Sequence, residues 1–216
     1  MNVELTWATP NAEEMIVKMA RVSAPSNQDN MDTAPRLLRY LIKHKHWSPF
    51  EMANMCVEIE TTRAISPQIL RHRSFSFQEF SQRYADTNAL GPAVIPHLRR
   101  QDNKNRQNSI DDLSSEEIGG YYRRISELYE NAEHLYREMV SSGIAKECAR
   151  SVLPLSTQTR LFMNGTIRSW IHYLDLRTDN GTQLEHRQIA GEIKRIFCKQ
   201  FPIVAEAMFT KDPALN

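Results

Sequence analysis

The sequence predicts an α+β fold in one domain, residues 1–216, with a small antiparallel sheet packed against several helices, one of them long. Its length of 216 residues suits one substantial domain. Helical periodicity dominates, and the few strand-like segments do not alternate regularly with helices. No repeat or Gly/Ser-rich linker divides the chain, and 41% hydrophobic with 25% charged residues is ordinary globular composition.

The N-terminal half contains two strand patterns and three helix patterns. Strands are expected at 3–9 and 52–61, and helices at 10–23, 32–45 and 61–73. Asn11 is the expected N-cap of the first helix, with Glu14 in the capping-box position. Thr33, ahead of Pro35, repeats this start signal in the second helix. Pro67 must occupy the first turn of the third helix, or it would kink that helix.

The C-terminal half begins with the longest helix pattern. Ser114 and Glu117 form a capping box at its start, and Gly143 ends it. The dipeptide Asn164–Gly165 indicates a turn that closes a strand. The expected elements are helices over 114–143, 145–153 and 166–177, a strand over 159–163, and a helix from Thr182, in a capping box with Glu185, to about Lys199.

Residues 85–112 form a long segment with prolines, asparagines and basic residues but little periodicity. Long loops of this kind are often functional, and a lid over a substrate site is one hypothesis. A nucleic-acid-binding module is another, with a footprint of Arg99, Arg100, Lys104 and Arg106 beside aromatic residues at 75–84. The net charge of +1 and Glu79 inside the basic run argue against that module.

Cysteine usage and the absence of targeting signals predict a cytoplasmic protein that binds no membrane. Cys56, Cys148 and Cys198 are too scattered for a disulfide framework or zinc site, so reduced thiols are expected. No apolar run approaches the ~20 residues of a membrane span, and the N-terminus lacks a signal-peptide pattern. His44 and His46 have no further ligand at useful spacing, so no metal is expected.

The segment "RHRSFSFQEFSQRY", residues 71–84, concentrates positive charge beside hydroxyls and amides. A solvated helix end is the simpler interpretation, because cations are favoured at a helix C-terminus. The alternative is a site that surrounds a multiply charged ligand, since arginines bind phosphate in a bidentate manner and hydroxyls complete the contacts. This mixture suits a nucleotide, although the chain has neither a P-loop nor a GxGxxG motif.

Two further groups of residues and one separate arginine accompany this segment. Arg168 and His172 stand four apart on one helix face, and Arg177 follows where that helix should end. In "HKHWSPFE", residues 44–51, polar side chains are free to point into a cleft. Arg150 lies in apolar helical surroundings, and its simplest interpretation is a surface ion pair with Glu147.

These residues resemble a known family. Arg71-His72-Arg73, seven further residues and then Ser81 match the RHRx7S pattern of the flavin-dependent thymidylate synthases. "HWSPFE", "RAISPQILRHR", "ARSVLPL" and "RSWIHYLDLR" resemble the other blocks of that family, in its order. The resemblance implies a homotetramer with FAD in which several subunits build each active site. It also implies conversion of dUMP to dTMP, with methylenetetrahydrofolate as carbon donor and NADPH as reductant.

The resemblance also implies residue roles. Arg177 is expected to polarise the uracil ring and is the catalytic candidate. The expected FAD contacts are His46, Ser48, Arg71, His72, Arg73, Glu79, Thr166, Arg168 and His172. The expected dUMP contacts are Gln68, Arg71, Glu79, Ser81, Arg83, Arg150 and Arg177. The sequence departs from the family at Met52, where many members have His, at Gln78 and Thr166, where members have Asn, and at Gly181-Thr182-Gln183.

No enzyme nucleophile is expected to attack uracil. Cys148 is the only cysteine with an obvious cationic neighbour, Arg150, and it is interpreted as structural. Ser81 lacks a partnered His-Asp pair. The sequence leaves open whether the substrate is dUMP or another pyrimidine nucleotide.

Overall fold

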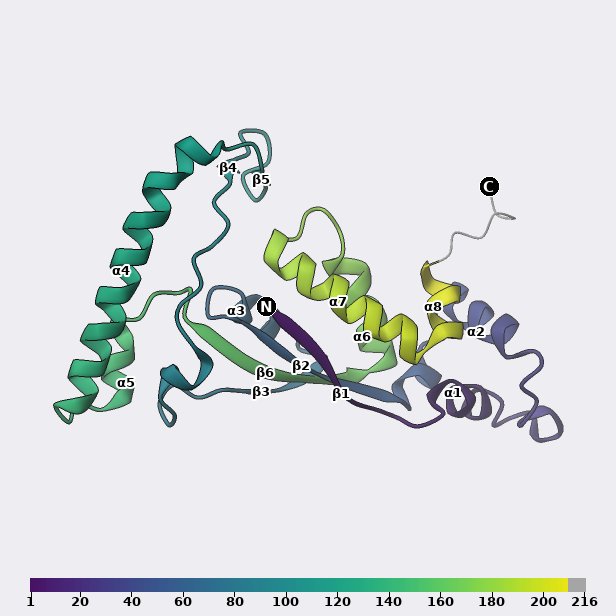
Figure 1. The fold of residues 1–216 in the computed structure, drawn as a ribbon. Helices are drawn as coiled ribbons and strands as arrows, with labels where there is room; N and C mark the ends of the chain where they lie inside the picture. Colours follow the sequence, from purple (N-terminus) through teal and green to yellow (C-terminus); the bar gives the residue numbers. More distant parts are fainter. Residues whose placement is uncertain (210–216) are drawn as a thin grey trace.

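The computed structural model describes residues 1–209 and confirms the α+β fold. Four antiparallel strands form one sheet in the order β1-β2-β6-β3 (Figure 1). They are β1 (Asn2–Ala8), β2 (Asn54–Thr62), β6 (Gln158–Thr166) and β3 (Phe75–Glu79). The excursion at 85–112 contains a separate two-stranded pair, β4 (Arg100–Gln101) and β5 (Ser109–Ile110).

The helices follow the expected order, with one addition at the C-terminal end. They are α1 (Ala12–Ala20), α2 (Ala34–Lys43), α3 (Ser66–Leu70), α4 (Ser115–Ser141), α5 (Lys146–Ala149), α6 (Ile167–Arg177), α7 (Leu184–Gln200) and α8 (Pro202–Phe209). Short 3-10 turns are η1 (Pro25–Asn27), η2 (Ser48–Glu51), η3 (Thr87–Leu90) and η4 (Arg150–Val152). The sequence did not predict α8, whose apolar composition gives little periodicity. Within residues 1–209, no helix has the length and apolar character to cross a membrane.

The core lies between one face of the sheet and the helices α6 and α7 (Figure 1). Alternate residues of the central strands point into it, including Val57 and Ile59 of β2 and Leu161 and Met163 of β6. Trp170 on α6 is fully buried, and its indole Nε1 donates to the carbonyl of Met55, 2.9 Å away. This bond and the surrounding apolar contacts fix α6 against the sheet.

The predicted turn at Asn164–Gly165 is wrong, because both residues lie inside β6. Gly165 pairs with Phe75 across the β3–β6 ladder. A Cβ at position 165 would lie 2.4 Å from the Phe75 ring, so only glycine fits there. The glycine therefore permits a close approach between strands.

The signals at the ends of α4 are confirmed. Ser114 and Glu117 form both bonds of a capping box. Gly143 follows the helix with a φ of 85°, the left-handed conformation that favours glycine. Both signals come from residues next to the helix end itself.

Three other expected caps are wrong. Asn11 precedes α1 in a left-handed conformation, without a side-chain cap. The Thr33 hydroxyl accepts a hydrogen bond from Arg21 Nη2, 2.7 Å away, instead of capping α2. Helix α7 begins two residues after Thr182, and Glu185 pairs with Arg99. In the last two cases, the side chain binds an arginine far away in the sequence instead of capping the helix.

Candidate active site

Arg177, the last residue of α6, is held by a histidine of the RHR triplet. Its Nε donates to Nε2 of His72, 2.8 Å away, where the chain leaves α3. Since the guanidinium can only donate, Nε2 of His72 must be the acceptor. His72 is therefore neutral, with its proton on Nδ1.

His72 lies in an aromatic environment that favours this neutral form. Its ring centroid is 4.9 Å from that of Tyr173, whose hydroxyl is 3.1 Å from Nε2 of the fully buried His186. Burial lowers the pKa of His72 to about 4, and the Arg177 charge acts in the same direction. Burial and then Arg177 likewise lower the pKa of His186 to about 4, while burial raises the pKa of Tyr173. Arg177 is thus the cation of this cluster at neutral pH.

A second set of candidates lies where η2 packs against α6. Arg168 forms an ion pair with Glu51 at the end of η2. The ring of His172, one turn further along α6, stands edge-on to Trp47 with centroids 4.9 Å apart. The α6 group, as it is called below, consists of Ser48, His72, Arg168, His172 and Arg177. Three of these residues lie on α6, His72 is bonded to Arg177 of α6, and Ser48 lies in η2, which packs against α6.

A third set lies beside α5, at the other side of the sheet. Arg83 pairs with Glu147 of α5 at 2.9 Å, and Lys146 Nζ donates to the carbonyl of Tyr84 at 3.1 Å. Arg150 follows α5 directly, in η4. The expected Arg150–Glu147 pair is wrong, because Glu147 binds Arg83, and no residue in the described chain binds the Arg150 guanidinium. Ser81, Arg83 and Arg150 are called the α5 group below.

Glu79, the last residue of β3, is positioned by two residues that the sequence did not single out. Arg63 lies 2.7 Å from its carboxylate, and Thr159 donates to the same oxygen at 3.0 Å. Both partners are long-range, so no local motif could have predicted them. They fix the Glu79 carboxylate at the edge of the sheet.

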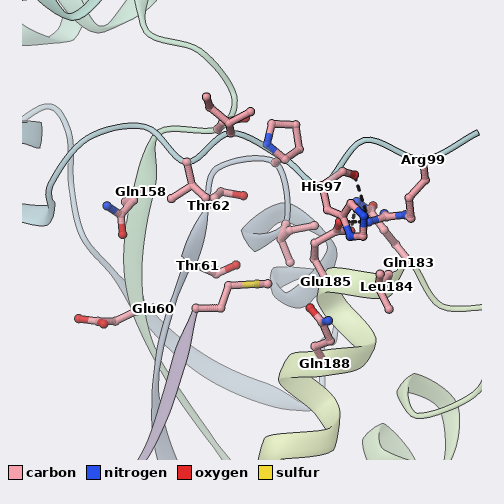
Figure 2. Close-up of a pocket in the computed structure, with 17 residues that line it drawn as sticks. Glu60, Thr61, Thr62, His97, Arg99, Gln158, Gln183, Leu184, Glu185 and Gln188 are labelled. Atoms are coloured by element: carbon pink, nitrogen blue, oxygen red, sulfur yellow. Dashed lines mark hydrogen bonds and ion pairs between the residues drawn. The ribbon is translucent and has the colours of Figure 1, made fainter. Parts of the chain in front are cut away.

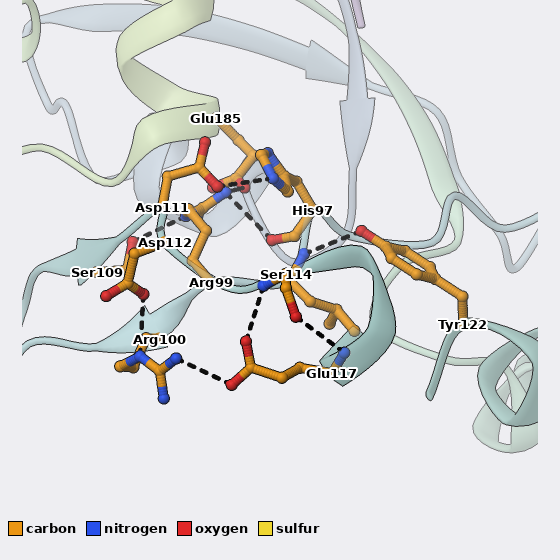
Figure 3. Close-up of polar contacts among 11 residues, drawn as sticks. His97, Arg99, Arg100, Ser109, Asp111, Asp112, Ser114, Glu117, Tyr122 and Glu185 are labelled. Atoms are coloured by element: carbon orange, nitrogen blue, oxygen red, sulfur yellow. Dashed lines mark hydrogen bonds and ion pairs between the residues drawn. The ribbon is translucent and has the colours of Figure 1, made fainter. Parts of the chain in front are cut away.

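The basic residues divide into paired and unpaired ones. Arg99 binds Glu185 in the first turn of α7, 2.7 Å away (Figure 2). Arg100 binds Asp112 at 2.9 Å and Glu117 at 3.1 Å, so the excursion is fastened to the start of α4 (Figure 3). Two of the four basic residues proposed to contact nucleic acid, Arg99 and Arg100, are therefore already bound to carboxylates of the same chain.

Arg71 and Arg73 behave differently. Both are exposed, and neither has a carboxylate partner among residues 1–209. Arginines that remain unpaired next to His72 and Arg177 are available to bind an anion. The geometry therefore favours a site for a phosphorylated ligand over a solvated helix end.

Comparison with known proteins identifies the family of the chain. A family model described as "Thymidylate synthase complementing protein" matches residues 4–203. A flavin-dependent thymidylate synthase from Synechocystis is 52% identical over 196 residues, covering 91% of this chain and 89% of that protein. The chain belongs to this family.

One further relative and one solved structure match over most of their length. A protein of Paramecium bursaria Chlorella virus 1, described as "Probable flavin-dependent thymidylate synthase", is 53% identical over 198 residues, 91% of this chain and 90% of its own. A crystal structure of the UMP/dUMP methylase PolB from Streptomyces cacaoi, bound with 5-Br dUMP, superposes with a TM-score of 0.84. PolB is 30% identical, and the match covers 95% of this chain and 93% of PolB.

Two expected contacts of this thymidylate synthase chain have protein partners. Gln68 Nε2 donates to Gln183 Oε1 at 2.6 Å, which joins the middle of α3 to the start of α7. Thr166, where family members often have Asn, is the N-cap of α6 and accepts from the backbone N–H of Ser169 at 3.2 Å. The threonine thus keeps a structural role at this departure from the family pattern.

Cys56 and Cys148 lie on different elements and differ in exposure. Cys56 lies on β2 and is buried, which raises the pKa of its thiol, although a hydrogen bond with Thr6 acts in the opposite direction. Cys148 is exposed on α5. Neither position has the features of a nucleophile that attacks a pyrimidine ring.

Proposed function

We propose that the chain converts dUMP to dTMP with FAD as cofactor, methylenetetrahydrofolate as carbon donor and NADPH as reductant. Membership of the flavin-dependent thymidylate synthase family supports the reaction. The observation that carries the residue-level proposal is the bond from Arg177 to a neutral His72 inside the RHRx7S segment.

The donor set near the RHR triplet fits FAD. Arg71 and Arg73 supply two unpaired positive charges for a pyrophosphate, as arginine forks require. When bound, FAD supplies the electron transfer and the one-carbon transfer that the reaction requires. The residues proposed to hold it are the triplet itself, Ser48, Glu79, Thr166, Arg168, His172 and His46.

The nucleotide is proposed to lie between the α5 group and Arg177. Ser81, Arg83 and Arg150 would bind its phosphate, while Gln68 and Glu79 would contact the rest of it, with Arg71 shared with FAD. Because the Nε of Arg177 is engaged by His72, its two terminal amino groups remain to face the uracil. A fixed guanidinium there stabilises negative charge as it develops on the ring.

His72 is proposed to position Arg177 in addition to contacting FAD. A neutral imidazole holds the guanidinium in one orientation without adding a second positive charge beside it. No thiolate takes part in this scheme, and the raised pKa of the buried Cys56 thiol supports this.

A homotetramer with shared active sites is proposed because single-chain contacts leave the site in two parts. Among the described side chains, no hydrogen bond or ion pair connects a residue of the α5 group with a residue of the α6 group. Helix α4 also carries an apolar stripe with no cover: Tyr121, Leu128 and Leu135, seven residues apart, are 58%, 63% and 44% exposed. A stripe at this spacing is typical of a helix that packs on another helix.

The proposal is tested first by the visible spectrum of the purified chain during titration with FAD and then dUMP. We expect about one flavin per chain and a spectral change on adding dUMP, because both ligands share one site. dTMP formation is then measured with methylenetetrahydrofolate and NADPH. A protein that binds no FAD and ignores dUMP would contradict the proposal.

Methylation of UMP is a second candidate, and the likeness to PolB favours it. PolB is described as a UMP/dUMP methylase and has also been solved with 5-Br UMP, at the same TM-score of 0.84. The ratio of kcat/KM for dUMP and UMP separates the candidates. A high ratio supports dUMP alone, and comparable values support both substrates.

A further inference from the structure

A cavity of about 300 Å³ lies beside the site, between the end of β2, residues 94–99 and the first turn of α7 (Figure 2). We propose that this cavity binds an uncharged pyrimidine-type heterocycle, as base or nucleoside, separately from dUMP. The volume is at the lower end of the range for small-molecule sites. The proposal concerns a site that the proposed reaction does not use.

Thr61 at the floor of the cavity is the first observation. This β2 residue is 2% exposed, and its hydroxyl has no hydrogen-bond partner among the described residues. Figure 2 shows it facing the space between β2 and α7. Burial of an unpaired hydroxyl destabilises a fold, and because this one lines a cavity it is available to a ligand that binds there.

The charged side chains around the cavity are the second observation, and each of them has a partner of opposite sign. Arg99 binds Glu185 at 2.7 Å, and Glu60 is bound by Arg160 at 2.9 Å. These ion pairs leave no side-chain charge free to bind an ionic ligand. The cavity therefore suits a neutral ligand.

The remaining polar groups define the ligand further. Gln188 on α7 points its amide into the same space as Thr61 (Figure 2), and no described residue binds that amide. A primary amide and a hydroxyl can each donate and accept, so together they complement a ring edge with adjacent C=O and N–H groups. Pyrimidine bases carry such an edge.

The other walls are apolar, as a planar ring requires. Ile65, Val94, Ile95 and Leu184 line the cavity. Val94 is 46% exposed and lies in the excursion that Arg99 fastens to α7. A ring could thus enter beside residue 94 and rest against aliphatic side chains.

The cavity adjoins the nucleotide site without sharing its arginines. Gln183 lines the cavity, and its Oε1 accepts from Gln68, a proposed dUMP contact. None of Arg71, Arg83, Arg150 and Arg177 lines it. We therefore expect the cavity to stay available when dUMP is bound.

The test uses thymidine as the probe, titrated by calorimetry into the full chain loaded with FAD and saturated with dUMP. We expect a single thymidine site per chain. Thr61→Val should weaken thymidine binding about tenfold or more, because the ring edge loses a partner. The same change should raise the Tm of the ligand-free protein by about 2–4 °C, since the unpaired hydroxyl disappears.

Ser66→Ala is the matched control. Ser66 also has a buried hydroxyl without a partner among the described residues, but it does not line the cavity. This variant should raise the Tm and leave thymidine affinity unchanged. Val94→Trp is a second variant at an exposed position, where the larger ring should fill the entrance and abolish thymidine binding.

Three results would overturn the proposal: no thymidine binding to the dUMP-saturated wild type, competition between thymidine and dUMP, or normal binding by both Thr61→Val and Val94→Trp. The heat of thymidine binding does not depend on dTMP formation. A wild-type protein that binds thymidine but makes no dTMP would therefore count against the proposed function alone.

Discussion

Helices α4 and α6 use their apolar residues in different ways. The 11-residue α6 buries Ile167, Ser169, Trp170, Ile171, Tyr173 and Leu174 inside its own chain. The 27-residue α4 buries Tyr136 alone. Tyr122, Tyr129 and Tyr136 form a stripe toward the rest of the chain, whereas Tyr121, Leu128 and Leu135 form a second stripe toward solvent. The pattern of α6 is satisfied within one chain, and that of α4 is not.

The arginines beside the two helices differ in the same way. Arg177 and Arg168 are oriented by His72 and Glu51. Arg150, after α5, has no side-chain partner among residues 1–209. Arg177 and Arg168 are therefore oriented within the chain, and under the proposed assembly a ligand and a neighbouring subunit would complete the surroundings of Arg150. The following experiments test this contrast, from the largest expected effect to the smallest.

Removing the Arg177 guanidinium should eliminate catalysis. Arg177→Ala should lower kcat for dTMP formation by about 10²–10³ or more, because the counter-charge to the uracil ring is lost. The variant should still fold and bind FAD, as judged by circular dichroism and the visible spectrum. Arg195→Ala is the control, since Arg195 makes only an exposed pair with Glu192. Normal turnover in Arg177→Ala would identify the wrong arginine.

Changing the open stripe should disrupt assembly. The double substitution Leu128→Glu and Leu135→Glu places charges on the exposed stripe, where a partner helix would have to bury them. We expect smaller particles in sedimentation analysis and a loss of activity of about tenfold or more. Glu127→Gln, on the exposed surface of the same helix, serves as the control. An intact tetramer in the double variant would place the interface elsewhere.

The close contact beneath α6 should be sensitive to a single methyl group. Gly165→Ala should reduce the free energy of unfolding by about 2–3 kcal/mol, because the new Cβ would clash with Phe75. Gly191→Ala in α7 meets no atom within 4 Å and should add about 0.5–1 kcal/mol through helix propensity. Urea denaturation measures both, and equal stabilities would contradict the predicted clash.

The histidines that pack against α6 predict acid sensitivity. His72 and His186 both have a pKa of about 4 in the fold, below the ordinary value of 6.5. Between these values the unfolded chain binds more protons, so stability is full above pH 6.5 and is lost as pH falls toward 4. Each histidine contributes up to about one proton to this slope.

Substitution of one histidine isolates its share of the slope. His186→Leu should make the free energy of unfolding less dependent on pH between 4 and 6.5, as measured by denaturation across that range. His134→Leu, at an exposed position on α4, is the matched control. An unchanged slope in His186→Leu would show that this histidine does not titrate on unfolding.

The smallest effect is expected at Cys148. Cys148→Ser changes an exposed thiol on α5, and activity should stay within about twofold, because the proposed reaction requires no thiolate. A folded but inactive variant would restore the nucleophilic route. Steady-state dTMP formation beside the wild type decides between them.

Local signals were predicted well from the sequence, whereas signals that serve distant contacts were misread. The Ser114–Glu117 capping box depends only on residues within one helical turn, and it is present. Asn164–Gly165 has the composition of a turn, but its glycine is required by Phe75 on another strand. Glu185 fits a capping box by spacing, yet Arg99 from the excursion binds it.

The same distinction applies to the site. The RHRx7S pattern identified the triplet, and the separate segment "RSWIHYLDLR" identified Arg177, because their residue types are visible in the sequence. The bond between His72 and Arg177 depends on α3 and α6 ending at the same place. The sequence did not identify Tyr173 or His186 as part of the site, because an aromatic residue on a buried helix face usually belongs to the core. Their contact with each other depends on the packing of α6 against α7.

The separation of Arg150 from Arg177 has a consequence for genetics. If each site draws these residues from different subunits, Arg150→Ala and Arg177→Ala chains are defective in different halves of it. Mixed assemblies then contain some sites with both arginines intact. Two inactive alleles expressed together should restore growth without thymidine, a case of complementation within one gene that a site confined to one chain does not allow.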